Sequence, residues 1–66
     1  MNRKKIGRVK SPKGKLFDVY WDDRTGEVFV QAVGGFLGGG LMKRCSAKAK
    51  TPAHAMQIAE ACVYDQ

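Results

Sequence analysis

Residues 15–33 read KLFDVYWDDRTGEVFVQAV, and the rest of the fold follows from this stretch. Two runs within it, at 16–21 and 28–33, are rich in the aromatic and β-branched residues that favour strands. The polar residues between the runs include Gly26, which suits the positive φ that a four-residue hairpin loop commonly needs near its end. The stretch therefore predicts a β-hairpin.

The register of this hairpin follows if Asp22 pairs with Glu27. One face is then apolar throughout, and its pairs are Trp21 with Val28, Val19 with Val30, and Phe17 with Ala32. The opposite face is mixed, and its pairs are Leu16 with Val33, Asp18 with Gln31, and Tyr20 with Phe29. A slip of one residue would bury Asp18 and Gln31, so the alternation favours this register.

The chain has 66 residues, of which 44% are hydrophobic. Such a short chain forms one core, so we predict a flexible basic arm at residues 1–4 and a single small domain at residues 5–66. Its two cysteines lack the number and spacing of a disulfide framework, which indicates a reducing cytoplasm. The N-terminal basic residues are not followed by the apolar run of a signal peptide, so we expect no export signal and no membrane contact.

A further strand is expected at residues 6–10, before the hairpin. The turn Ser11-Pro12-Lys13-Gly14 then reverses the chain, because proline fixes φ and glycine permits the reversal. The expected cross-strand pairs are Val9 with Phe17, Arg8 with Asp18, and Ile6 with Tyr20. The pair of Arg8 and Asp18 would be an ion pair that partly neutralises the acid on the mixed face.

Residues 41–50 alternate small residues with polar ones, which predicts a fourth strand. Its inward residues would be Cys45, Ala47 and Ala49. Thr51 is a good N-cap, Pro52 suits the first helical position, and apolar residues recur at helical spacing through residue 64. The predicted fold is α+β: a four-stranded antiparallel β-meander with one C-terminal α-helix packed on one face. The predicted core consists of Val9, Phe17, Val19, Trp21, Val28, Val30, Ala32, Cys45, Ala47, Ala55, Ile58, Ala59 and Cys62.

The chain is strongly basic, with 12 Lys and Arg residues against 6 Asp and Glu and a net charge of +6. Its positive charge is segregated, because residues 3–15 and 43–50 carry eleven of the basic residues and no acid. Segregated positive charge is typical of proteins that bind polyanions, since neutralised phosphates release their counterions. The alternative is a solvated surface that only keeps the protein soluble.

A single helix covers only one face of a sheet, so the mixed face is expected to stay open to solvent. Tyr20 and Phe29 would be exposed rings among cations, as in platforms that stack the bases of single-stranded nucleic acid. The predicted nucleic-acid-binding residues are Arg3, Lys4, Lys5, Arg8, Lys10, Lys13, Lys15, Tyr20, Phe29, Arg44 and Lys48. The pattern does not distinguish DNA from RNA, or single from double strands.

Other functions compete for the same face. Tyr20 and Phe29 also suit a cross-strand aromatic pair that only stabilises the hairpin. A symmetric homodimer would also cover the apolar residues of this face. The second hypothesis is therefore a non-enzymatic protein-interaction or homodimerising protein, of an accessory or inhibitory kind, that docks on an acidic partner.

Residues that carry chemistry are scarce. Cys45, His54 and Cys62 do not have a usual zinc spacing and lack a fourth ligand. The glycine-rich residues 34–40 lack the Lys followed by Ser or Thr that ends a P-loop, and they predict a strand connection in which Phe36 and Leu37 pack over the core or form an exposed tip. We therefore expect no enzyme activity, no catalytic residues, no metal site and no cofactor.

Consecutive strands followed by one helix that begins Thr51-Pro52-Ala53-His54-Ala55-Met56 form a layout that resembles the arm-type DNA-binding domains at the N-termini of tyrosine integrases. The resemblance covers the topology of residues 6–64 and implies a sheet face that enters the major groove of duplex DNA. The extra strand and the glycine-rich connection depart from that plan. No residue roles are therefore carried over from the family.

Overall fold

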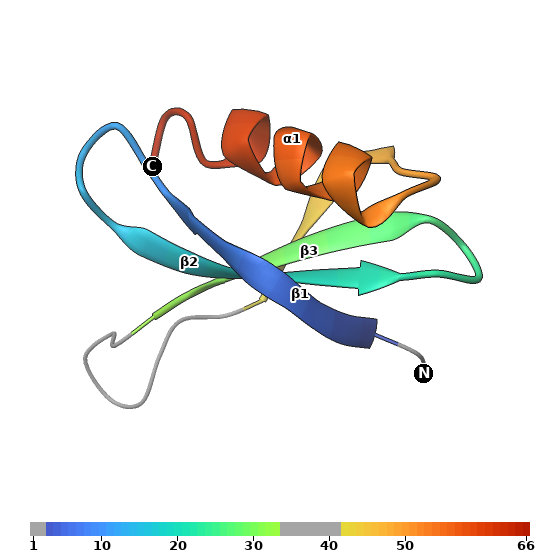
Figure 1. The fold of residues 1–66 in the computed structure, drawn as a ribbon. Coiled ribbons are helices and arrows are strands. Elements are labelled where there is room, and N and C mark those ends of the chain that lie inside the picture. Colours follow the sequence, from blue (N-terminus) through green and yellow to red (C-terminus); the bar gives the residue numbers. More distant parts are fainter. Residues whose placement is uncertain (1–2, 34–41) are drawn as a thin grey trace.

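A computed structural model describes residues 3–33 and 42–66. It contains one antiparallel sheet followed by a helix, with the elements β1 (Arg3–Lys10), β2 (Leu16–Asp22), β3 (Glu27–Ala32), β4 (Lys43–Lys48) and α1 (Pro52–Cys62). The strands pair in sequence order, and α1 lies across one face of the sheet (Figure 1). The predicted α+β meander is therefore confirmed.

The hairpin of β2 and β3 has the register that the alternation predicts. Val19 pairs with Val30 and Tyr20 pairs with Phe29. The turn is held by the side chain of Asp22, whose Oδ1 accepts hydrogen bonds from the backbone N–H groups of Arg24 (2.9 Å) and Thr25 (3.3 Å). These bonds, above all the one from Arg24, lower the pKa of Asp22, because they favour its charged form.

The N-terminal half of β1 differs from the prediction in where the strand begins and in how it pairs with β2. It begins at Arg3 rather than Ile6, so Arg3 and Lys4 belong to the strand and not to an arm. A bulge lies between Lys5 and Gly7, and Lys5 rather than Ile6 pairs with Tyr20. The bulge allows Ile6 to pack against the core without turning the rest of the strand over.

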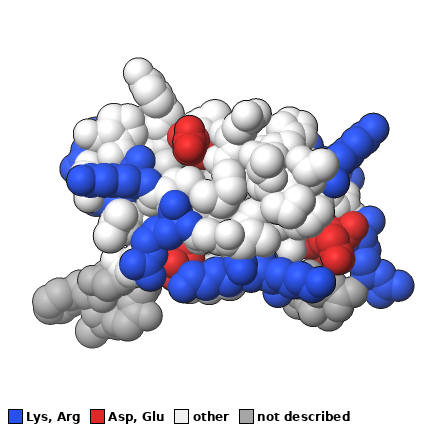
Figure 2. Space-filling model, in the orientation of Figure 1, with Lys and Arg blue, Asp and Glu red and all other residues white. Residues whose placement is uncertain are grey.

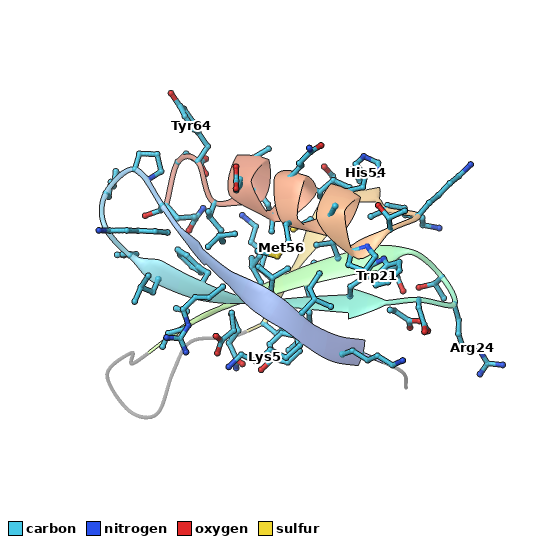
Figure 3. The ribbon with its side chains drawn as sticks, viewed as in Figure 1. Lys5, Trp21, Arg24, His54, Met56 and Tyr64 are labelled. Atoms are coloured by element: carbon cyan, nitrogen blue, oxygen red, sulfur yellow. The ribbon has the colours of Figure 1, made fainter. Side chains whose placement is uncertain are left out.

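Gly7 lies on the face of β1 that α1 covers, where a side chain would collide with the helix. A Cβ atom at this position would lie 3.0 Å from the Cε atom of Met56 and 3.1 Å from its sulfur. Figure 3 shows Met56 pointing from α1 toward the sheet. Because Gly7 has no side chain, Met56 can pack between the helix and β1.

Strand β4 pairs irregularly with β3. Its register shifts between the pair of Glu27 with Lys48 and the pair of Phe29 with Arg44. Ala47 lies within this irregular stretch and is exposed, so its predicted place in the core was wrong. Ala49, which was also predicted to face inward, is buried. Its N–H donates to the carbonyl oxygen of Gly26 at 2.8 Å, and its own carbonyl accepts from the Trp21 indole N–H at 3.1 Å.

Helix α1 begins as predicted. Thr51 Oγ1 accepts a hydrogen bond from the backbone N–H of His54 at 3.1 Å, and Pro52 occupies the first turn. The helix ends at Cys62, with buried Val63 as its C-cap. The buried core consists of Val9, Phe17, Val19, Val28, Val30, Cys45, Ala49, Ala55, Ala59 and Val63. The other predicted core residues, apart from Ala47, are partly buried and pack against this cluster.

The connection from β3 to β4 passes through residues 34–41, which lie outside the described residues. The predictions for the glycine-rich residues 34–40, including those for Phe36 and Leu37, therefore also lie outside the described residues. In the part of the chain that the structure does describe, no helix has the length and apolar character needed to cross a membrane.

Candidate nucleic-acid interface

The sheet face away from α1 is rich in basic side chains. Cross-strand partners share a face, so the pairing registers place on it Arg3, Lys5, Arg8, Lys10, Asp18, Tyr20, Phe29, Gln31 and Arg44, which we call the basic face. Lys48 pairs with Glu27 at the end of the same sheet. Figure 2 shows Lys and Arg side chains in a band below the helix, whereas the surface over the helix carries few charges.

Asp18 lies at the centre of the basic cluster on β1 and β2. Its Oδ1 lies 3.1 Å from Nε of Arg8, which confirms the predicted ion pair, and 3.3 Å from Nζ of Lys5. Lys5 reaches Asp18 because the bulge turns it toward this face. Desolvation raises the pKa of Asp18, but the hydrogen bonds and charges of Arg8 and Lys5 more than offset this and leave the pKa below 3.8.

Replacing Asp18 with asparagine is expected to make folding less sensitive to acid. A carboxylate with a lowered pKa stabilises the fold fully above its unfolded pKa of about 3.8, and this contribution is lost as the pH falls through the lower folded value. Urea titrations from about pH 7 down to about pH 2 should show a smaller loss of stability for Asp18→Asn than for the wild type. The difference should be up to about 1 kcal/mol per ion pair.

Asp65→Asn is the matched control, because it removes the same charge from the exposed residues that follow α1. It should follow the wild-type profile. An Asp18→Asn profile that coincides with the wild type would contradict a stabilising role for the ion pairs on the basic face.

Phe29 is not the exposed ring that the sequence predicts. Only 6% of its surface is exposed. The guanidinium carbon of Arg3 lies 4.1 Å from the ring centroid, and Nη1 of Arg3 donates to the sulfur of Met42 at 3.1 Å. Arg3 therefore crosses from β1 over the middle of the sheet and covers Phe29 as a cation–π partner. Tyr20, its cross-strand neighbour, is half-buried.

Two further ion pairs neutralise part of the predicted site. Arg44 Nη1 lies 3.2 Å from Oε2 of Glu27, and Lys4 Nζ lies 3.4 Å from Oδ2 of Asp23. The basic partner in each pair has 68% of its side chain exposed. Such surface pairs contribute about 0–1 kcal/mol, so a phosphate can replace the carboxylate at little cost.

The remaining cations of residues 3–15 gather at the turn between β1 and β2. Lys10, Lys13 and Lys15, which we call the turn lysines, are exposed. None of them takes part in an ion pair with another described residue. This end of the sheet therefore carries positive charge without a compensating acid.

The backbone of that turn is held by Ser11, which is 3% exposed. Its N–H donates to the carbonyl of Lys15 at 2.7 Å, and its Oγ accepts from the Lys15 N–H at 3.1 Å. Gly14 has φ of 86° and donates to the Ser11 carbonyl at 2.9 Å. The three lysines thus project from a turn that is fixed by hydrogen bonds.

The thiols lie between the sheet and the helix. Cys45 is buried, and burial together with a hydrogen bond to Cys62 raises the pKa of Cys45 to about 12. A thiol with this pKa stays protonated at neutral pH and is a poor nucleophile. Within residues 3–33 and 42–66, no group of three or more His, Cys, Asp or Glu side chains is arranged to hold a metal ion.

Comparison of the chain with protein-family models, curated proteins and solved structures finds no match. The geometry and charge of the basic face and the turn lysines are therefore the features from which a function can be inferred. The structure places Arg8 and Tyr20 on one face as the sequence predicts, and the bulge in β1 adds Lys5 to them. It also places Arg3 over the ring of Phe29. This contact could not be predicted, because the sequence did not show that β1 begins at Arg3.

Proposed function

We propose that the protein is a non-enzymatic nucleic-acid-binding module that contacts phosphates through β1 and the turn lysines. The observation that carries this proposal is the group of Lys10, Lys13 and Lys15, which projects from a fixed turn and has no acidic partner among the described residues. Phosphate contacts position a nucleic acid without reading its sequence, and lysine is well suited to them.

The length of β1 suits a polyanion with regularly spaced charges. The strand has eight residues, which extend over roughly 23 Å at about 3.3 Å per residue. Phosphates follow one another closely along a nucleic acid, so β1 is long enough to contact several of them. Lys5 and Arg8 already hold a carboxylate between them and are positioned to exchange it for phosphate oxygens.

The aromatic part of the platform is smaller than the sequence predicts. Because Arg3 covers Phe29, the proposal includes no stacking of a base on Phe29. Tyr20 remains half-buried beside Lys5. Affinity should therefore come mainly from charge, and the proposal covers DNA and RNA equally. A reducing compartment such as the cytoplasm fits it, because Cys45 and Cys62 are free thiols.

A structural role for the same cations is the main competing explanation. β1 is an edge strand of the sheet, and lysines on edge strands prevent pairing with other chains. That role needs no ligand. It also predicts that removal of the turn lysines changes self-association and leaves nucleic-acid binding unaffected.

Fluorescence anisotropy with labelled single-stranded and duplex oligonucleotides tests the proposal. Binding should weaken steeply between about 50 and 200 mM salt. The combined variant Lys10→Ala, Lys13→Ala and Lys15→Ala should reduce the slope of log affinity against log salt by about 2–3, since each lost phosphate contact removes about 0.7–0.9. The affinity at physiological salt should fall roughly 10- to 100-fold.

Two controls separate local contacts from total charge. Replacement of the three turn lysines by arginine keeps the charge and should keep the affinity and the salt slope. Lys43→Ala removes one charge from β4 and should weaken binding less than Lys13→Ala does. Equal effects of these two single variants, or a triple alanine variant that binds like the wild type, would contradict the proposal. A dimer that binds no oligonucleotide at low salt would favour the protein-interaction hypothesis.

A further inference from the structure

A hollow of about 400 Å³ lies at the opposite end of β2 from the turn lysines. It opens between the turn that joins β2 to β3 and the segment that joins β4 to α1. Its walls are residues 23–26 on one side and 48–50 on the other, and Trp21 also lines it. Figure 3 shows Trp21 below the N-terminal end of α1, with Arg24 at the end of the neighbouring turn.

Hydrogen bonds fix the two walls relative to each other. Ala49 donates to the Gly26 carbonyl at 2.8 Å, and the Trp21 indole N–H donates to the Ala49 carbonyl at 3.1 Å. The approach is so close that a Cβ atom on Gly26 would lie 2.9 Å from the Ala49 carbonyl oxygen. The hollow is therefore preformed, which reduces the entropy lost when a ligand binds.

The charge around the hollow favours an anion. Three basic residues line it, namely Arg24, Lys48 and Lys50. The one acidic residue of the lining is Asp23, and its carboxylate lies 3.4 Å from Nζ of Lys4. Lys48 and Lys50 are exposed and take part in no ion pair with another described residue.

Trp21 adds an aromatic surface to this positive environment. It is half-buried, and its indole nitrogen is already satisfied by Ala49, so the rest of its ring contributes apolar surface to the lining. An aromatic ring beside several cations is the combination that holds a base by stacking and its phosphate by charge. A volume of about 400 Å³ lies within the usual range of small-ligand sites.

We propose that this hollow holds one nucleotide of a single-stranded nucleic acid, with the base against Trp21 and the phosphate beside Lys48 and Lys50. The inference depends on the proposed function for its ligand class and adds a second contact point and a preference for single strands. β2 separates the hollow from the turn lysines by about 20 Å. An oligonucleotide too short to span that distance should lose one of the two contacts.

Trp21 is the only tryptophan in the chain, so its fluorescence reports on the hollow directly. An oligothymidylate of about twelve nucleotides should quench this fluorescence as it binds. The double variant Lys48→Ala and Lys50→Ala should weaken the quenching titration roughly tenfold, since two phosphate contacts are lost. Lys48→Arg with Lys50→Arg keeps the net charge and should bind like the wild type, and Lys43→Ala is the control for the loss of one positive charge elsewhere.

The outcomes separate this inference from the proposed function. Oligothymidylate binding that depends on the turn lysines but leaves Trp21 fluorescence unchanged would overturn the inference alone. Quenching that depends on Lys48 and Lys50 but not on the turn lysines would support the hollow and contradict the proposed function. Equal quenching by a duplex of the same length, or by inorganic phosphate alone, would also overturn the inference, because neither places an unstacked base on Trp21.

Discussion

Replacement of Phe17 by alanine is expected to lower the free energy of unfolding by about 3–5 kcal/mol, the usual cost of truncating a buried aromatic side chain. Phe17 has 7% of its surface exposed and belongs to the core cluster with Val9 and Val19. A chain of 66 residues has a total stability of roughly 3–10 kcal/mol, so this change removes a large part of it. Urea denaturation followed by circular dichroism measures the loss.

Leu16→Ala is the matched control for this experiment. Leu16 is the neighbouring residue of β2, points to the opposite face and is 41% exposed. Its truncation should change the stability by about 0.5 kcal/mol. Phe17→Leu provides a milder change if Phe17→Ala does not fold. A larger effect at Leu16 than at Phe17 would mean that the register of β2 is shifted by one residue.

Gly26→Ala is expected to destabilise the protein by about 3 kcal/mol, the upper end of the range for a residue forced into an unfavourable backbone conformation. Gly26 has φ of 83°, which L-residues other than glycine rarely adopt. In addition, the new Cβ would lie 2.9 Å from the Ala49 carbonyl oxygen, which is held in place by Trp21. Chemical denaturation again measures the change.

Gly14→Ala separates the effect of the positive φ from the effect of the close contact with Ala49. Gly14 has a similar φ of 86°, but a Cβ atom there would meet no other atom within 4 Å. Alanine at this position should therefore lower the free energy of unfolding only through its unfavourable φ, by about 1 kcal/mol. Equal effects at Gly14 and Gly26 would show that the contact between the turn and Ala49 contributes nothing to stability.

The hairpin could be predicted because its information is local. The alternation in residues 16–33 separates apolar from polar side chains so strongly that one register is favoured, and the observed pairs follow it. The cap of α1 is equally local, since Thr51 and Pro52 act on the residues that follow them. Both predictions needed no knowledge of distant contacts.

The parts that could not be predicted depend on contacts between distant residues. Ile6 and Val9 both pack toward the core although their spacing does not fit a regular strand, and the bulge before Gly7 resolves the conflict. Phe29 is covered by a long side chain from another strand, which no local pattern encodes. The hollow at Trp21 likewise joins segments that are far apart in the sequence.

The contact between Trp21 and Ala49 also bears on the order in which the chain folds. These residues are 28 positions apart, whereas β2 and β3 are joined by a short turn. Hairpins with short turns form within microseconds, and contacts between distant residues form later because they fix more of the chain. We therefore expect the hairpin to form before α1 docks. Until then, Val19 and Val30 face solvent, and this early species is the one most prone to associate with other newly made chains.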